Sequence, residues 1–114
     1  MKITGSNVTV MVKDMDKSIK FYENIGLELK HRWENHYAQL AAPDIIIGLH
    51  PTKEEIPPNK QVSIGFEVKS IAEVKTMLDA NKIAYSFEEG KSGKYTHFKD
   101  PDGTYLYFRE SSGK

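Results

Sequence analysis

Residues 7–12 read NVTVMV, in which three valines alternate with other side chains. Alternation with a period of two is typical of a β-strand that buries one face, so Val8, Val10 and Val12 are expected in the core. A helix should follow, begun by Asp14 or Asp16 and ended at Gly26. Its predicted apolar stripe comprises Met15, Ile19, Tyr22 and either Ile25 or Phe21.

Three strands are expected after that helix, and the chain then repeats the same order of elements. The first three are predicted at 27–33, 36–42 and 45–50, separated by turn residues. A second alternating strand covers 62–68, and Ser70 begins a second helix that ends near Asn81. The last strands are predicted at 83–87, 95–99 and 104–110, with a flexible hairpin connection at 89–93 between the first two.

The two halves also match residue by residue. A shift of 56 places the three valines on Ile64, Phe66 and Val68, and a shift of 58 aligns HYAQLAAPD (36–44) with KYTHFKDPD (94–102). The same order of elements, with turn residues at matching positions, indicates a duplicated unit. We therefore predict one α+β domain over 1–114, made of two tandem βαβββ modules whose curved mixed sheets form a shared cleft. Module one covers about 4–51, the linker 52–60, and module two about 61–111.

The amino-acid composition argues against several classes of function. The chain has 114 residues, with 16 Lys plus Arg against 16 Asp plus Glu and no cysteine. A net charge of zero favours neither a nucleic-acid nor a membrane-surface partner, because both usually need a basic excess. The lack of cysteine excludes thiol catalysis, cysteine-based zinc sites and iron–sulfur clusters. Nothing resembles a signal peptide or a membrane span, so a cytoplasmic protein is expected.

Strand alternation also predicts which side chains lie opposite the core faces and so line the cleft. The candidate ligand-binding residues are Asn7, Tyr37, Ser63, Glu67, Tyr95, His97, Tyr105, Tyr107 and Arg109. His97 and Glu67 are also the candidate catalytic residues, as a base with its orienting partner, although two independent polar groups would give the same pattern. The tyrosines either wall a pocket for a planar or cationic ligand or fill the gap between modules. Arg109 either clamps a ligand anion or pairs with an acid.

Several stretches resemble a known family. They are NVTVMVKD at 7–14, Ser18 with Phe21 and Tyr22, IGL at 25–27, and FKDPDG at 98–103. Together they resemble the vicinal oxygen chelate superfamily, which holds glyoxalases, extradiol dioxygenases, fosfomycin-resistance enzymes and bleomycin-resistance proteins. The resemblance implies the two-module fold and a homodimer. It leaves the chemistry open, because that superfamily hosts unrelated reactions on one scaffold.

In metal-using members of that superfamily, His, Glu or Gln side chains hold a divalent ion, and the resemblance assigns those positions here. They fall on Asn7, Ser63, Tyr107 and Leu49, or on His50 after a slip of one residue. An amide, a hydroxyl, a phenol and an aliphatic group are poor ligands for such ions. The sequence therefore predicts no metal and no other cofactor, as in the bleomycin-resistance branch.

The favoured function is a metal-independent small-molecule-binding protein that sequesters an aromatic or cationic ligand. The alternative is a metal-dependent or atypical lyase, isomerase or dioxygenase of the same superfamily, so whether the protein is an enzyme stays open. A third alternative is a regulatory or structural module whose cavity has filled. The expected partners are a small molecule and a second copy of the chain, not nucleic acid or membrane.

Overall fold

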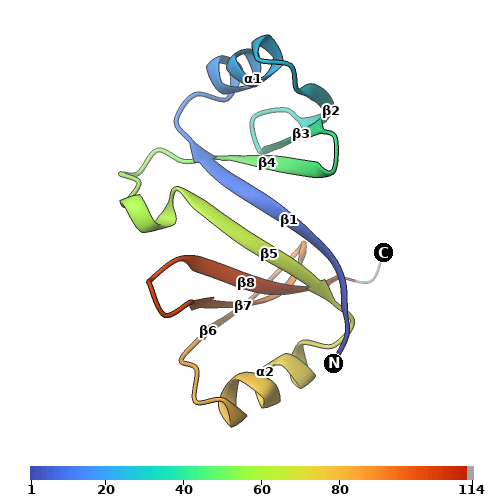
Figure 1. Cartoon of the computed structure of the whole chain (residues 1–114), viewed down its shortest axis with the longest axis vertical. Helices are drawn as coiled ribbons and strands as arrows, with labels where there is room; N and C mark the ends of the chain where they lie inside the picture. The colour runs from blue at the N-terminus through green and yellow to red at the C-terminus, as the bar shows by residue number, and fades with distance from the viewer. Residues whose placement is uncertain (113–114) are drawn as a thin grey trace. The chain divides into compact units, whose positions relative to one another are not determined.

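The structure is a computed structural model that describes residues 1–112 (Figure 1). These residues form eight strands, two α-helices and a short 3-10 helix. The first half contains β1 (Ile3–Val12), α1 (Met15–Asn24), β2 (Glu28–Trp33), β3 (Tyr37–Ala42) and β4 (Ile45–Pro51). After η1 (Pro58–Lys60), the second contains β5 (Val62–Val68), α2 (Ile71–Ala80), β6 (Ser86–Gly90), β7 (Gly93–Lys99) and β8 (Tyr105–Ser111). The α+β class and the repeated βαβββ order are confirmed.

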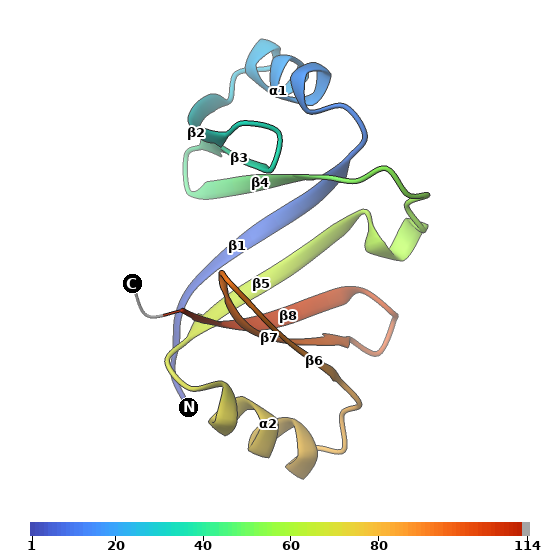
Figure 2. The same cartoon turned by 180° about the vertical axis from the view of Figure 1, so that it is seen from behind.

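The described chain divides into two compact units. The N-terminal unit comprises residues 7–63, and its strands lie in the order β2-β3-β4-β1, with β1 parallel to β4 and the other pairs antiparallel. The C-terminal unit comprises residues 64–112 with residues 1–6, and its strands lie in the order β5-β8-β7-β6. Figure 2 shows β6, β7 and β8 with α2 on one side of them. None of the helices in residues 1–112 is both long and apolar enough to cross a membrane.

The core of the N-terminal unit lies between α1 and its strands. Asp14 accepts a hydrogen bond from the Lys17 backbone N–H at 3.1 Å, which caps α1. The predicted Val12, Met15 and Ile19 are buried, and Val10 and Tyr22 pack against them. The remaining buried members are Ala38, Leu40 and Leu49.

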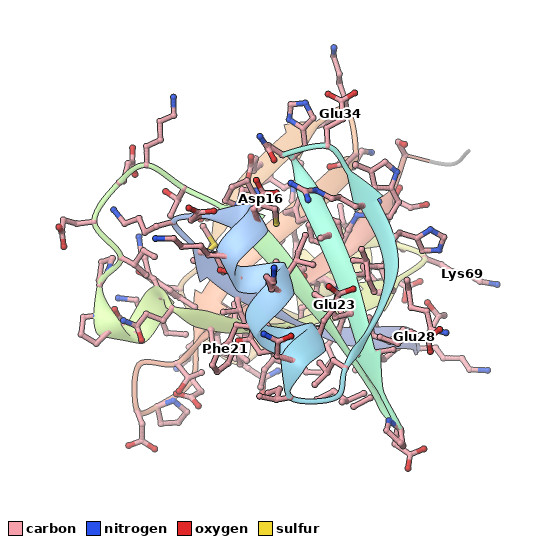
Figure 3. The ribbon with its side chains drawn as sticks, turned by 90° about the horizontal axis from the view of Figure 1, so that it is seen from above. Asp16, Phe21, Glu23, Glu28, Glu34 and Lys69 are labelled. Atoms are coloured by element: carbon pink, nitrogen blue, oxygen red, sulfur yellow. The ribbon has the colours of Figure 1, made fainter. Side chains whose placement is uncertain are left out.

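The predicted stripe of α1 was wrong at its last position, because both alternatives are exposed. Phe21 is 58% exposed on the surface of α1 (Figure 3), and Ile25 is 60% exposed. Met15, Ile19 and Tyr22 already follow the i, i+4, i+7 spacing of one face, and Phe21 lies a full 100° step before Tyr22. Ile25 is the C-terminal cap residue, so it lies beyond the regular helix.

The core of the C-terminal unit lies between α2 and the sheet. Ser70 caps α2 by accepting from the Glu73 backbone N–H at 3.2 Å. The buried side chains are Val68, Ile71, Val74, Leu78 and Phe108. The predicted strand at 83–87 starts three residues later, at Ser86, because the chain leaves α2 through Lys82, which has a φ of 58°. The hairpin predicted at 89–93 is confirmed, but its turn is tight and not flexible, because the two strands extend to Gly90 and Gly93.

Thr96 is fully buried, and within the described residues its hydroxyl has no hydrogen-bond partner. Replacing Thr96 by Val should raise the free energy of unfolding by about 1 kcal/mol, since an isosteric methyl removes a buried unpaired polar atom. Chemical denaturation of Thr96→Val measures this change. Thr76→Val is the control, because the exposed Thr76 hydroxyl donates to Ala72 O at 3.2 Å. The burial argument would be contradicted if Thr96→Val lost as much stability as Thr76→Val.

Candidate functional site

The predicted site residues lie in both units, with most of them in the C-terminal one. Phe66, Val68, Phe98 and Phe108 face the core under α2. Alternation therefore places their sequence neighbours on the opposite face of the sheet. Glu67, Tyr95, His97, Tyr105, Tyr107 and Arg109 occupy that face of the C-terminal unit, whereas Asn7, Tyr37 and Ser63 belong to the N-terminal unit.

Three rings gather on this face of the C-terminal unit. The rings of Tyr95 and His97 stack with centroids 5.8 Å apart and planes within 10°. Tyr107 joins them, with its centroid 6.0 Å from Tyr95 and 6.1 Å from His97. The antiparallel register of β7 and β8 produces this arrangement, because it places His97 directly opposite Tyr107 and Tyr95 opposite Arg109. We call Tyr95, His97 and Tyr107 the ring platform.

The ring of Tyr107 lies directly over Gly65 of the neighbouring strand β5. A Cβ atom built on Gly65 would collide with the Tyr107 ring and hydroxyl. The missing side chain therefore gives the ring its place on the sheet. Tyr105 lies at the other end of the same ladder, opposite Lys99, whose ammonium is 5.3 Å from the centre of the Tyr105 ring.

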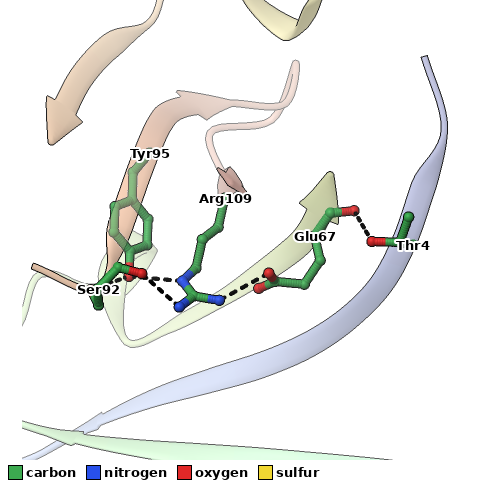
Figure 4. A network of polar contacts seen from close by, with 5 residues as sticks. All are labelled: Thr4, Glu67, Ser92, Tyr95 and Arg109. Carbon is green, nitrogen blue, oxygen red and sulfur yellow. Dashed lines mark hydrogen bonds and ion pairs between the residues drawn. The ribbon is translucent and has the colours of Figure 1, made fainter. Parts of the chain in front are cut away.

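Arg109 is held at one end of the ring platform by three hydrogen bonds (Figure 4). Its Nη1 donates to Glu67 Oε1 at 2.9 Å, its Nε to the Tyr95 hydroxyl at 3.2 Å, and its Nη2 to Ser92 O at 2.6 Å. The Tyr95 oxygen thus accepts from Arg109, and its own O–H can donate to Ser92 Oγ at 2.8 Å. Glu67 is itself tied to β1, since its backbone oxygen accepts from Thr4 Oγ1 at 3.2 Å.

Of the two interpretations of Arg109, the structure contains the ion pair with an acid. Burial alone would lower the pKa of Arg109, but the hydrogen bond with Tyr95 and the negative charge of Glu67 outweigh it and raise that pKa. Arg109 is therefore always protonated, and its charge compensates that of Glu67. The two side chains are 28% and 35% exposed, so the pair is partly shielded from water.

His97 pairs with a residue that sequence reasoning missed. Its Nε2 lies 3.0 Å from Glu88 Oε1 on β6, so its partner is Glu88 and not the predicted Glu67. A carboxylate can only accept, so the proton of a neutral His97 ring is on Nε2 and the acceptor lone pair is on Nδ1. The sequence predicted this strand at 83–87, so Glu88 lay outside the predicted strand. Two glycines separated by the two residues Lys91 and Ser92 were the available signal for a tight hairpin that brings Glu88 opposite Tyr95.

The N-terminal unit carries a second row of rings. His31, Trp33 and Tyr37 follow one another with centroids 5.4 and 5.6 Å apart, and Trp33 is 48% exposed. Tyr37 lies over Gly48 of β4 much as Tyr107 lies over Gly65, because a Cβ on Gly48 would collide with its ring. Asn7 and Ser63 are half-buried in this unit.

Comparison with known proteins agrees with this architecture. The family described as the Glyoxalase/Bleomycin resistance protein/Dioxygenase superfamily matches residues 6–108. The chain belongs to this superfamily. A comparison with curated proteins finds no match.

Solved structures of the superfamily fold are similar over nearly the whole chain. A glyoxalase/bleomycin resistance protein/dioxygenase superfamily member from Vibrio splendidus 12B01 is 19% identical, with 94% of this chain and 98% of that chain covered and a TM-score of 0.69. A structure described as NAD-dependent benzaldehyde dehydrogenase from Legionella pneumophila is 20% identical, with 95% and 100% covered and a TM-score of 0.80. A glyoxalase I variant from Zea mays is 15% identical, with 98% and 45% covered and a TM-score of 0.70. At these identities the similarity shows the fold alone.

The divalent metal ion that this superfamily implies does not fit the residues at the expected positions. Leu49 is fully buried in the N-terminal core, so the side chain that replaces a ligand there is aliphatic and points away from the opposite face. His50 lies on that opposite face, and its Nδ1 contacts Pro51 O at 3.1 Å. Asn7, Ser63 and Tyr107 offer an amide, a hydroxyl and a phenol, which are weak donors for such ions. Within residues 1–112 no three His, Asp or Glu side chains form a cluster that could hold a metal.

Proposed function

We propose that this superfamily member binds a small aromatic or cationic molecule on the ring platform and does so without a metal ion. The main support is the gathering of Tyr95, His97 and Tyr107, with ring centroids 5.8–6.1 Å apart on one face of the sheet. Aromatic rings gathered in this way are suited to stack on a planar ligand and to attract a positive charge. Sequestration of such a ligand is the function we propose.

Binding is a better proposal for this face than proton transfer. The pair formed by His97 and Glu88 has the bond that an imidazole base and its orienting carboxylate need, at 3.0 Å. However, the two side chains are 42% and 66% exposed, and catalytic bases are usually tuned by burial inside a cleft. The rings beside them need no such shielding to hold a planar ligand.

Replacing Tyr107 by Ala is expected to weaken the binding of N-methylacridinium, a planar cation, about two- to twelvefold. A stacked ring contributes about 0.5–1.5 kcal/mol beyond area burial, which corresponds to that factor in Kd. Titration calorimetry in buffer with excess EDTA measures the Kd and tests metal independence at the same time. Circular dichroism confirms that the variant keeps its fold.

Phe87→Ala is the matched control for this experiment. Phe87 belongs to the same unit and is 42% exposed, but it lies on the other face of β6, where the Lys75 ammonium is 3.5 Å from its ring centre. Its removal should leave the Kd for the dye unchanged. The proposal fails if EDTA abolishes binding, or if Tyr107→Ala and Phe87→Ala have the same effect.

A further inference from the structure

Among residues 1–112, the face that carries the ring platform holds two carboxylates, Glu67 and Glu88, and only Glu67 is paired with a permanent cation. Glu67 is paired with Arg109 at 2.9 Å, and the bonds of Arg109 to Tyr95 and Ser92 keep the guanidinium in that place. A raised pKa keeps Arg109 charged, so this pair contributes no net charge. Glu67 is therefore a poor counter-charge for a ligand.

Glu88 differs from Glu67 in its partner. It accepts a hydrogen bond from His97 Nε2 at 3.0 Å, and an imidazole, unlike a guanidinium, is not a permanent cation. Its side chain is 66% exposed, so a ligand can approach it from solvent. Its strand position opposite Tyr95 places it beside the stacked rings of Tyr95 and His97. Lys99, a further cation of this face, lies over Tyr105 at the far end of the ladder.

We propose that Glu88 determines the charge preference of the ring platform and selects ligands that combine a planar ring with a positive charge. The ring stacks on Tyr95 and His97, and the cationic centre lies beside the Glu88 carboxylate. This inference rests on the proposed function and deepens it, because it names the ligand class and the residue that selects it. A neutral ligand with the same ring binds the platform but gains nothing from Glu88.

The experiment compares two dyes with the same ring system, N-methylacridinium and acridine, at a pH where acridine is neutral. The ratio of the two Kd values measures charge preference apart from stacking. Glu88→Gln removes the charge but keeps an oxygen that accepts from His97, so the stacked pair is preserved. We expect this variant to bind N-methylacridinium about two- to fivefold more weakly, the range of an exposed ion pair, and to bind acridine as the wild type does.

Glu89→Gln is the matched control, because it removes the same charge from the adjacent position of β6. Strand alternation places Glu89 on the other face, so its ratio of Kd values should equal that of the wild type. The proposal is overturned if Glu88→Gln leaves the ratio unchanged or shifts it no more than Glu89→Gln does. If Tyr107→Ala still weakens both dyes in that case, the platform stands and only the role of Glu88 fails. If neither dye binds the wild type, both proposals fail.

Discussion

Replacing Leu49 by Ala is expected to lower the free energy of unfolding by about 3 kcal/mol. Leu49 is fully buried in the N-terminal core, between its strand neighbours Val10 and Ala38. Truncation removes apolar atoms from this core and leaves a cavity that the surrounding side chains fill only in part, which typically costs about 3–5 kcal/mol. Trp33 is the single tryptophan and belongs to the same unit, so its fluorescence during urea denaturation reports the change.

Ile46→Ala is the control for this prediction. Ile46 lies on the same strand and loses a side chain of the same number of carbons, but it is 44% exposed. Its truncation should cost less than about 1 kcal/mol. Equal losses in the two variants would show that Leu49 contributes no more to the N-terminal core than the exposed Ile46 does.

The side chains that share a face could be predicted from the sequence, because strand alternation depends only on the backbone. Tyr95, His97, Tyr107 and Arg109 were assigned to one face by their positions relative to buried neighbours such as Phe108, and they lie on it. Alternation does not predict which side chain on the neighbouring strand a given residue contacts. That choice depends on register, and in a hairpin the turn length sets the register.

The contacts of His97 and Arg109 illustrate this dependence on register. His97 was predicted beside Glu67, but the two-residue turn after Gly90 brings Glu88 opposite Tyr95 and within 3.0 Å of His97. Ser92 belongs to the same turn, and its carbonyl accepts a hydrogen bond from Arg109. A flexible hairpin connection at 89–93, as predicted, leaves this register undefined, whereas a two-residue turn defines it. A two-residue turn between Gly90 and Gly93 would have predicted the pairing of Glu88 with Tyr95.

The placement of Tyr107 over Gly65 leads to a second stability prediction. Gly65→Ala is expected to lower the free energy of unfolding by about 1–3 kcal/mol, because the added methyl collides with a ring that must then leave its place. Gly90→Ala is the control, since a Cβ there meets no atom within 4 Å. Urea denaturation of both variants measures the difference. The dye affinity should fall in Gly65→Ala as well, because Tyr107 no longer completes the ring platform.

A double-mutant cycle tests whether the collision with Tyr107 is the cause. When Tyr107 is already Ala, the methyl at position 65 has room, so Gly65→Ala should then cost less than about 0.5 kcal/mol. The two substitutions are therefore expected to be strongly non-additive, with the double variant about as stable as Tyr107→Ala alone. Additive losses would mean that the cost comes from the backbone of β5. In that case Gly65 would not be the residue that positions the Tyr107 ring.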